Sequence, residues 1–306
     1  NGKPESMSIN FYYYELQNLS GLSSWARGWQ ANAYAGGKGF MITGDPLIYF
    51  NGKNFLEPAY QHEGFFISAS WNGECFLLVG QRWAPGMGVF AGEYFPSNNS
   101  FVDLTPLFPQ YLNRSAILRS VSWNGTVFLI MGDRLSSSSY GTTLLYEYVP
   151  SEGRLLNVSY LLPPNFREVM DCCGNPLEEV ISIKGVFYTA IQSPEGFEMG
   201  RIVNGSFEQV NVNLSGFNLF YSNHDFMSYS NGSIYLYGTL QPGGPVVYML
   251  NASTFSARVI FSSSNGQIVA GEPFAYGYAV SLQGNGFKDL CFAVNTSGNW
   301  IALNVT

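Results

Sequence analysis

Charged and aromatic residues gather in five segments of the chain that are rich in Gly, Ser or Pro. These segments are 81–88, 133–141, 163–178, 216–225 and 240–245. They are longer than a hairpin turn requires, and loops on a rigid scaffold are where binding residues usually lie. The candidate binding residues are Arg82, Trp83, Arg134, Tyr140, Arg167, Glu168, Asp171, Tyr221, His224 and Asp225, with Asp133 beside Arg134.

These residue types favour recognition of a saccharide or of an anionic group. A guanidinium such as that of Arg82, Arg134 or Arg167 can hold a carboxylate or an anionic sugar through two parallel hydrogen bonds. The rings of Trp83 and Tyr140 can stack on sugar rings, or they can seal the loops that carry them. Long surface loops also collect polar residues that have no binding role. The proposal that these segments form a binding site is therefore a hypothesis.

Catalytic and metal-binding patterns are weak. His62 and His224 follow different repeat units, and the sequence contains no cluster of the three or four ligands that a metal site needs. A Ser-His-Asp triad that includes His224 would need a nucleophile elbow, and the sequence contains none. The pair Glu178–Glu179 could serve a glycosidase, although adjacent carboxylates are more often solvated. We therefore expect no catalytic residues, no metal and no cofactor, while enzymatic activity stays an open alternative.

Four cysteines are present, and two of them are adjacent. Cys172 and Cys173 could form a vicinal disulfide or remain two free thiols. Cys75 and Cys291 fall in non-adjacent repeat units, in the second strand of the second unit and the third strand of the sixth. Such a placement puts them beyond the Cα separation that a disulfide allows. We expect both to be buried and unpaired.

The chain is unusually rich in N-glycosylation sequons. Its 26 Asn and 43 Ser and Thr among 306 residues would give roughly four by chance. The sequence has eleven, at Asn18, Asn98, Asn113, Asn124, Asn157, Asn204, Asn213, Asn231, Asn251, Asn295 and Asn304. The excess predicts a glycosylated protein outside the cell, at a cell or virion surface.

Composition excludes several classes of protein. Charged residues make up 11% of the chain and the net charge is −7, so there is no basic excess to neutralise nucleic-acid phosphates. No apolar run approaches the length of a transmembrane helix, and no signal peptide is visible at Asn1. In acid the carboxylates become neutral and self-repulsion stays modest, so an acidic medium fits this composition, as a neutral extracellular medium also does.

A weak internal repeat predicts the fold. The segments "SASWNGECFLLVG" (68–80) and "SVSWNGTVFLIMG" (120–132) are close copies, and looser copies occur along the chain. Each unit contains four short strands joined by turns such as Asn-Gly, which suits a two-residue hairpin. Repeats of this length and content indicate a β-propeller. The predicted blades are 30–60, 66–110, 115–164, 178–216, 225–262 and 268–306.

The predicted architecture is therefore an all-β propeller of six four-stranded blades over 30–306. Residues 1–29 are expected to contribute strands that close or precede the ring, and a seventh blade is possible if they belong to another unit. Two face-packed β-sheets are the alternative architecture.

The "WNGxxFL" blade pattern, in a chain rich in Tyr, Ser and Asn, resembles secreted, glycosylated β-propeller surface proteins of thermoacidophilic archaea and their viruses. The sequence lacks the GH…WD signature of WD-type propellers and the S-x-D-x-G-x-T-W box of sialidase-type propellers. The resemblance therefore carries over no catalytic residues.

The leading functional hypothesis is a non-catalytic binding or adhesion module whose partner is another surface protein or a glycan. The alternatives are a glycan-acting hydrolase or lyase, and a structural subunit of a surface filament, coat or spike. Six sequons are expected at turns on one face of the propeller, namely Asn98, Asn124, Asn204, Asn231, Asn251 and Asn295. The opposite face, built from the long segments, is then expected to be nearly free of glycans and to contact the partner.

Overall fold

The structure is a computed structural model that describes residues 33–44, 46–60, 63–83, 87–135, 140–170, 178–219, 226–230, 232–240, 244–262, 267–274, 277–283, 290–296 and 299–304. Strands and short 3-10 helices form the regular structure in these ranges. None of the helices described there has the length and apolar character needed to cross a membrane. The strands predicted over 1–29 lie outside the described residues.

The strands follow one another in sheets. Sheet one contains β1 (Ala33–Gly36), β2 (Gly39–Ile42), β3 (Ile48–Phe50) and β4 (Phe55–Leu56). Sheet two contains β5 (Gly64–Trp71), β6 (Phe76–Arg82), β7 (Val89–Phe95) and β8 (Ser100–Asp103). Sheet three contains β9 (Ala116–Trp123), β10 (Phe128–Leu135), β11 (Tyr140–Val149), β12 (Arg154–Asn157) and β13 (Glu168–Met170).

Three further sheets complete the described strands. Sheet four contains β14 (Glu178–Ile183), β15 (Val186–Ser193), β16 (Gly196–Val203) and β17 (Ser206–Val210). Sheet five contains β18 (Phe217–Leu219), β19 (Met227–Ser230), β20 (Ser233–Leu240), β21 (Pro245–Asn251) and β22 (Ala257–Ser262). Sheet six contains β23 (Gln267–Phe274), β24 (Gly277–Gln283), β25 (Leu290–Thr296) and β26 (Asn299–Asn304). The 3-10 helices are η2 (Thr105–Leu107), η3 (Gln110–Arg114), η4 (Pro150–Glu152), η5 (Ser159–Leu161) and η6 (Pro164–Phe166).

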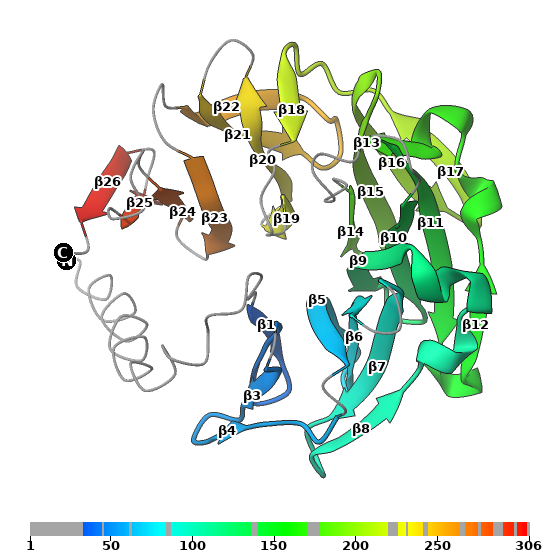
Figure 1. Cartoon of the computed structure of the whole chain (residues 1–306). Helices are drawn as coiled ribbons and strands as arrows, with labels where there is room; N and C mark the ends of the chain where they lie inside the picture. The colour runs from blue at the N-terminus through cyan, green and yellow to red at the C-terminus, as the bar shows by residue number, and fades with distance from the viewer. Residues whose placement is uncertain are drawn as a thin grey trace.

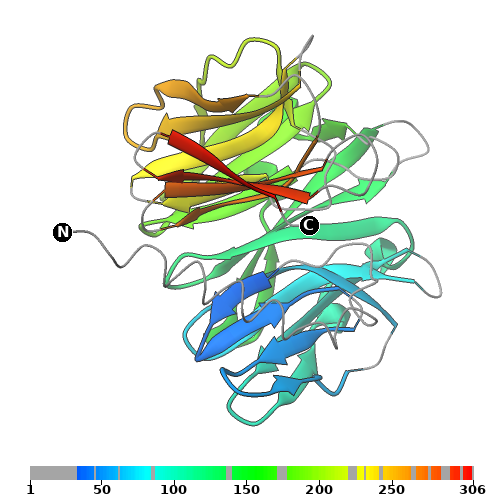
Figure 2. The same cartoon turned by 90° about the vertical axis from the view of Figure 1, so that its left-hand side faces the viewer.

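The sheets are arranged around a central axis. The innermost strands contact in order, β1 with β5, β5 with β9, β9 with β14, β14 with β19 and β19 with β23. Figure 1 shows these strands near the centre, and β4, β8, β12 and β17 at the rim. In the side view of Figure 2, the blue and cyan sheets and the yellow to red sheets lie on opposite sides of the green strands. The predicted all-β propeller with four-stranded sheets is confirmed.

Two strand positions are divided between two short strands. The outer position of sheet three holds both β12 and β13, because both pair with β11. The inner position of sheet five holds β18 and β19, which both pair with β20. The sequence analysis placed 163–178 and 216–225 in loops, which is wrong for β13 and β18, because each extends the pairing of its sheet. Likewise Asp133 and Arg134 lie within β10, and Arg82 ends β6.

The antiparallel order gives the propeller two distinct faces. The turns from first to second strand and from third to fourth strand lie on one face, here called the turn face. The ends where second strands finish and first strands begin lie on the other, here called the long-loop face. Arg82, Leu135 and Glu178 are at this second face, at the ends of β6, β10 and β14 respectively.

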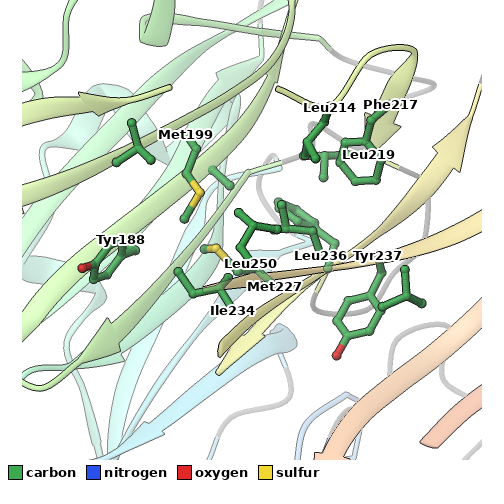
Figure 3. Close-up of a cluster of buried hydrophobic side chains, with 14 of the residues drawn as sticks. Tyr188, Met199, Leu214, Phe217, Leu219, Met227, Ile234, Leu236, Tyr237 and Leu250 are labelled. Atoms are coloured by element: carbon green, nitrogen blue, oxygen red, sulfur yellow. The ribbon is translucent and has the colours of Figure 1, made fainter. Parts of the chain in front are cut away.

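Within the described residues, the hydrophobic core lies between successive sheets, from sheet one to sheet five, so that the sheets in the middle of this series bury both of their surfaces. Along β6, Phe76 and Leu78 pack toward sheet one, whereas Leu77 and Val79 pack toward sheet three. Strand alternation accounts for this division, since successive side chains point to opposite sides. Figure 3 shows the corresponding cluster between sheets four and five, with Met199 of β16 among its side chains.

Side chains satisfy the backbone of neighbouring inner strands at each junction from sheet one to sheet five. Ile67 O accepts hydrogen bonds from Tyr34 Oη and Thr43 Oγ1, both at 3.2 Å. The amides of Val121 and Trp123 donate to Ser68 Oγ at 3.3 Å and Ser70 Oγ at 3.0 Å. Ser120 Oγ donates to Val180 O at 3.2 Å and accepts from Val180 N at 3.1 Å. Glu179 Oε2 accepts from the amides of Phe226 and Met227, both at 2.7 Å.

The repeated "WNG" turns have a clear physical role. Asn72 Oδ1 accepts hydrogen bonds from the amides of Glu74 and Cys75, both at 2.8 Å. Asn124 Oδ1 accepts from the amides of Thr126 and Val127, both at 2.9 Å. The glycine after each asparagine has a positive φ, 104° at Gly73 and 103° at Gly125, which an L side chain rarely adopts. The motif thus fixes the turn between first and second strands.

The cysteines agree with their prediction where they are described. Cys75 is buried and has no disulfide partner among the described residues, so this part of the prediction is confirmed, whereas its predicted place within the second strand is wrong, because it lies just before β6. Burial and the neighbouring Glu93 raise the pKa of the Cys75 thiol to about 12. Cys291 lies in β25, the third strand of sheet six, as predicted. Cys172 and Cys173 lie outside the described residues.

Replacing Ser120 with Ala tests the bond between sheets three and four. Ser120→Ala leaves the buried N–H and C=O of Val180 without this hydroxyl, which costs about 1–3 kcal/mol of stability. Chemical denaturation measures the loss, with Ser151→Ala at the exposed η4 as the control. Equal stability of the two variants would contradict the assigned role.

Candidate functional site

Three charged side chains are buried where sheets three and four meet. Asp133 is 0% exposed, Glu178 is 4% exposed and Arg119 is 9% exposed. Arg119 Nε lies 3.6 Å from Asp133 Oδ1. Charged groups are rarely buried unless they are paired, so three of them together mark this junction as chemically distinct. We call Arg119, Asp133 and Glu178 the charged cluster.

A β-bulge accounts for the position of Arg119. Gly132 pairs with Leu118 and Met131 pairs with Ser120, so Arg119 is the extra residue in β9. The same shift occurs in β5, where Ile67 is extra, and in β23, where Val269 is extra. Bulges redirect a side chain and are frequent beside active sites. Here the bulge places a guanidinium at a position that is aliphatic in the two other repeats.

Strand alternation accounts for the position of Asp133. Leu129 and Met131 of β10 pack in the core between sheets three and four, and Asp133 is the next residue on the same side. Glu178 begins β14 across that junction. Both carboxyl groups therefore lie toward the long-loop face, Glu178 on the innermost strand of sheet four and Asp133 on the second strand of sheet three. The sequence analysis expected Asp133 in a loop and the Glu178–Glu179 pair in solvent, and burial of all three corrects this.

The electrostatics of Glu178 are unfavourable for a carboxylate. Burial raises the pKa of Glu178 well above its ordinary value, the Asp133 charge raises it further, and Arg119 opposes both effects. In the described part of the chain, neither Glu178 oxygen has a hydrogen-bond partner. Removal from water without hydrogen bonds strongly disfavours an ionised carboxylate, so this position favours the neutral acid.

The repeats show what normally occupies the Asp133 position. Counted from the Phe at 76, 128 and 187, the sixth residue of the repeat is Gln81, Asp133 or Gln192. Gln192 Oε1 accepts the amide of Leu219 at 2.9 Å, and its Nε2 donates to Asn218 Oδ1 at 3.3 Å. This amide joins sheet four to sheet five. At the preceding junction a carboxyl group takes the place of the amide.

A second buried carboxyl group lies between sheets two and three. Glu93 of β7 is buried, and Cys75 Sγ donates to its Oε1 at 3.7 Å. Burial raises the pKa of Glu93, while hydrogen bonds from Tyr148 and Cys75 lower it. Glu93 therefore has donors that Glu178 lacks.

Exposed aromatic and apolar side chains gather near the long-loop ends of sheets two and three. Trp83 is 51% exposed, Met87 is 58% exposed and Tyr111 is 53% exposed. The Arg134 guanidinium carbon lies 5.5 Å from the Tyr111 ring centroid, a cation–π arrangement. Met87 pairs with Ser115 in a parallel bridge, which joins the loop of Trp83 to the segment of Tyr111. We call Trp83, Met87, Tyr111 and Arg134 the exposed patch.

The predicted arginines differ in how strongly they are held. Arg82 Nη2 lies 3.0 Å from Asp103 Oδ2 and 3.2 Å from Glu63 Oε2, so its charge is already neutralised. Arg167 is exposed, although its Nε donates to Leu162 O at 2.9 Å. Arg134 is exposed and lies over the Tyr111 ring.

The other predicted binding residues are only partly described. Glu168 is exposed at the start of β13, opposite Thr142. Tyr140 begins β11 and pairs with Met170, without a described side chain. Four predicted residues and one histidine considered as a metal ligand lie outside the described residues, namely Asp171, Tyr221, His224, Asp225 and His62. Within the described ranges, no three His, Cys, Asp or Glu residues form a group that could hold a metal.

The sequons lie at both ends of the sheets. Asn98, Asn124, Asn204 and Asn251 lie at turns of the turn face, and Asn295 lies near the end of β25 on the same side. Asn157 and Asn304 end fourth strands, and Asn113 and Asn213 lie between sheets, all on the long-loop side. The expectation of a nearly sequon-free long-loop face is therefore too simple, because fourth strands also end there. Asn18 and Asn231 lie outside the described residues.

Sequence reasoning missed Arg119, Met87 and Tyr111. An alignment of the two best repeats places Arg119 opposite Ile67, and a charge at an apolar repeat position is a usable signal. Tyr111 had no such signal, because its exposure depends on how η3 packs between sheets two and three.

The sequence matches no protein-family model and no curated protein. Solved structures do resemble it. TolB from Acinetobacter baumannii has a TM-score of 0.53 at 11% identity, over 90% of this chain and 63% of that chain. A chain of the nidogen/laminin complex has a TM-score of 0.51 at 6% identity, over 90% and 93%. The SapL1 lectin in complex with alpha methyl fucoside has a TM-score of 0.57 at 10% identity, over 91% and 96%. At these identities the likeness shows the propeller fold alone.

Removing the guanidinium of Arg119 tests the charged cluster. Arg119→Ala leaves Asp133 and Glu178 buried without their cation, so we expect a loss of about 3–5 kcal/mol in denaturant unfolding. The matched control is Arg154→Ala, which breaks an exposed pair with Glu152 and is expected to cost less than about 1 kcal/mol. Similar losses in both variants would contradict a special role for the cluster.

Proposed function

We propose that this chain is a non-catalytic binding module that contacts its partner through the exposed patch. The observation that carries the proposal is the exposure of Trp83, Met87 and Tyr111 at one end of two packed sheets, with Arg134 over the Tyr111 ring. Aromatic side chains and Arg are enriched at the centres of binding interfaces. The partner class is a glycan or another surface protein.

The patch suits an amphipathic ligand such as a saccharide. Aromatic rings offer flat apolar surfaces on which a sugar can stack, and the Arg134 guanidinium can donate several hydrogen bonds to hydroxyl or carboxylate oxygens. Rigid strand ends hold these groups, since Arg134 lies within β10 and Trp83 directly follows β6. Little conformational freedom is then lost on binding. The SapL1 lectin, whose structure contains alpha methyl fucoside, shares this fold and supports the glycan class.

We also propose that the protein is extracellular, at a cell or virion surface, and that it is N-glycosylated. The eleven sequons support this, and Asn98, Asn204, Asn213 and Asn251 are exposed at turns or between sheets. The resemblance to secreted propellers of thermoacidophilic archaea and their viruses supports the same location.

The ring is proposed to have six blades. Five junctions between successive inner strands support this count, the last of them between β19 and β23. Sheet six has the same four-strand order as sheets one, two and four. Its strands also match the predicted unit 268–306.

A glycan-acting hydrolase is the second candidate, favoured by the paired carboxyl groups of Asp133 and Glu178. A neutral acid beside an ionised carboxylate is the arrangement that glycoside hydrolysis requires. Both side chains are buried, however, so a substrate has no direct access to them in this conformation. The exposed patch therefore supports binding better than the charged cluster supports catalysis.

Binding by the exposed patch is testable with saccharides immobilised on an array. The triple variant Trp83→Ala, Tyr111→Ala, Arg134→Ala should lose at least about tenfold in affinity for whichever saccharides the native chain retains. Its melting temperature should change little, because exposed substitutions usually cost under about 0.5 kcal/mol each. Tyr160→Ala, at an exposed tyrosine of η5, is the matched control. Undiminished binding by the triple variant would remove the patch from the site.

Glycan mapping tests location and face together. Mass spectrometry of the protein from its natural source should find glycans on Asn98, Asn204 and Asn251, which are exposed on the turn face. Asn113 should be unmodified, because it lies two residues from Tyr111 and a glycan there would cover the exposed patch. A chain without glycans would contradict the glycoprotein proposal, and an occupied Asn113 would contradict the binding face.

A further inference from the structure

We propose that the charged cluster is a proton-binding site in which Asp133 and Glu178 together hold one proton at neutral pH, so that the junction of sheets three and four is tightest in acid. The proposal concerns the cluster and is separate from the binding role of the exposed patch. Three observations within the described residues carry it: the burial of both carboxyl groups, the presence there of one guanidinium beside two acids, and the lack of a described donor to either Glu178 oxygen.

The first step is the count of charges. With both acids ionised, Asp133, Glu178 and Arg119 would carry a net charge of −1 in a site that is at most 9% exposed. A buried, uncompensated charge is strongly unfavourable, and the usual response is neutralisation of the group. One bound proton removes the excess charge, since it leaves one carboxylate opposite one guanidinium.

The second step is the location of the proton. Arg119 Nε lies 3.6 Å from Asp133 Oδ1, so Asp133 is the acid that remains ionised beside the cation. Neither Glu178 oxygen has a hydrogen-bond partner in the described part of the chain. A protonated Glu178 gains an O–H donor directed by the nearby negative charge. Two carboxyl groups that share a site behave in this way, one of them titrating far above its usual range.

The third step concerns the charged groups near Glu178 among the described residues. On β14 itself, Glu179 is occupied by the amides of Phe226 and Met227. On β15, Glu178 pairs with the apolar Ile191, and beyond it Glu198 of β16 accepts from Gln209 Nε2 at 2.8 Å. On β9 and β10, Arg119 and Asp133 are the charged groups that influence Glu178. On β19, Tyr229 lies at the far end of the strand, paired with Ile234.

The repeat supplies independent support. At the next junction, Gln192 uses a donor and an acceptor to join sheet four to Leu219 and Asn218 of sheet five. Leu219 occupies the strand position in sheet five that Glu178 occupies in sheet four, since each pairs with the sixth residue of the second strand of its sheet, Gly238 of β20 and Ile191 of β15 respectively. The Gln192 amide accepts one hydrogen bond and donates one, and a protonated carboxylic acid can do the same. Protonation therefore lets the Asp133–Glu178 junction imitate the Gln192 junction.

The sign of the pH dependence follows from the raised pKa of Glu178 in the folded chain. In the unfolded chain Glu178 has its ordinary pKa of about 4.3. Stability from the bound proton is therefore fully present below that value and is lost as the pH rises through the folded pKa. The site favours the folded state in acid and weakens it in alkali.

Thermal unfolding of the full chain tests the proposal at about pH 4 and about pH 8. Glu178→Gln mimics the protonated acid, so it should match the native melting temperature at the lower pH and exceed it by roughly 3 °C or more at the higher pH. Glu168→Gln, at an exposed glutamate of β13, should leave the pH dependence unchanged. Parallel pH profiles for native chain and Glu178→Gln would overturn the proposal, as would a lower melting temperature of the variant at the higher pH.

Infrared spectroscopy of the folded protein provides a second measurement that does not require a stable variant at every pH. A carbonyl band of a protonated carboxylic acid should persist at about pH 7. Glu93 could contribute to it, so the comparison is between Glu93→Gln and the double variant Glu93→Gln, Glu178→Gln. A band that is present in the first and lost in the second supports the site. Absence of the band from Glu93→Gln shows that Glu178 is ionised, and it overturns the proposal.

Discussion

The structure depends on how the innermost strands of neighbouring sheets satisfy one another's backbone. A strand near the axis is crowded by two other sheets, and its buried N–H and C=O groups need partners. Side chains of Tyr34, Ser68, Ser120 and Glu179 supply them across successive junctions. The hydrophobic clusters then fill the space between sheets that these bonds hold in register. A propeller built this way tolerates few charges inside, which agrees with the low charge content of the chain.

This constraint explains why the two notable groups of side chains differ so much. The exposed patch lies at strand ends, where Trp83 and Tyr111 can face solvent without disturbing the junctions. The charged cluster lies within a junction, where Asp133 and Glu178 replace the neutral groups found at the next one. The exposed patch is available to a partner, whereas the charged cluster affects the stability of the junction between sheets three and four. The two roles can therefore be altered separately.

Much of the fold could be predicted from the sequence, whereas the site could be predicted only in part. The "WNG" turns and the alternation along 76–82 and 128–135 are local patterns, so the blade limits came close, with 66–110 predicted against strands over 64–103. Strand β18 was missed because its partner β20 is not the next strand in the sequence, so no hairpin pattern marks their pairing. Burial of Asp133 follows from strand length and register, which the sequence does not state. Exposure of Trp83 and Arg134 was predictable because both border Gly-, Pro- or Ser-rich segments.

The bulge at Arg119 has a consequence for how such a chain can change over evolutionary time. A bulged residue has no partner in the ladder, so its replacement alters no strand pairing. Ile67, Arg119 and Val269 occupy this position in three repeats that otherwise keep the same geometry. Duplication of a blade therefore copies a scaffold together with one position whose side chain can change without a change in strand pairing. A cation at that position in one copy creates an asymmetric centre among sheets that share one strand order.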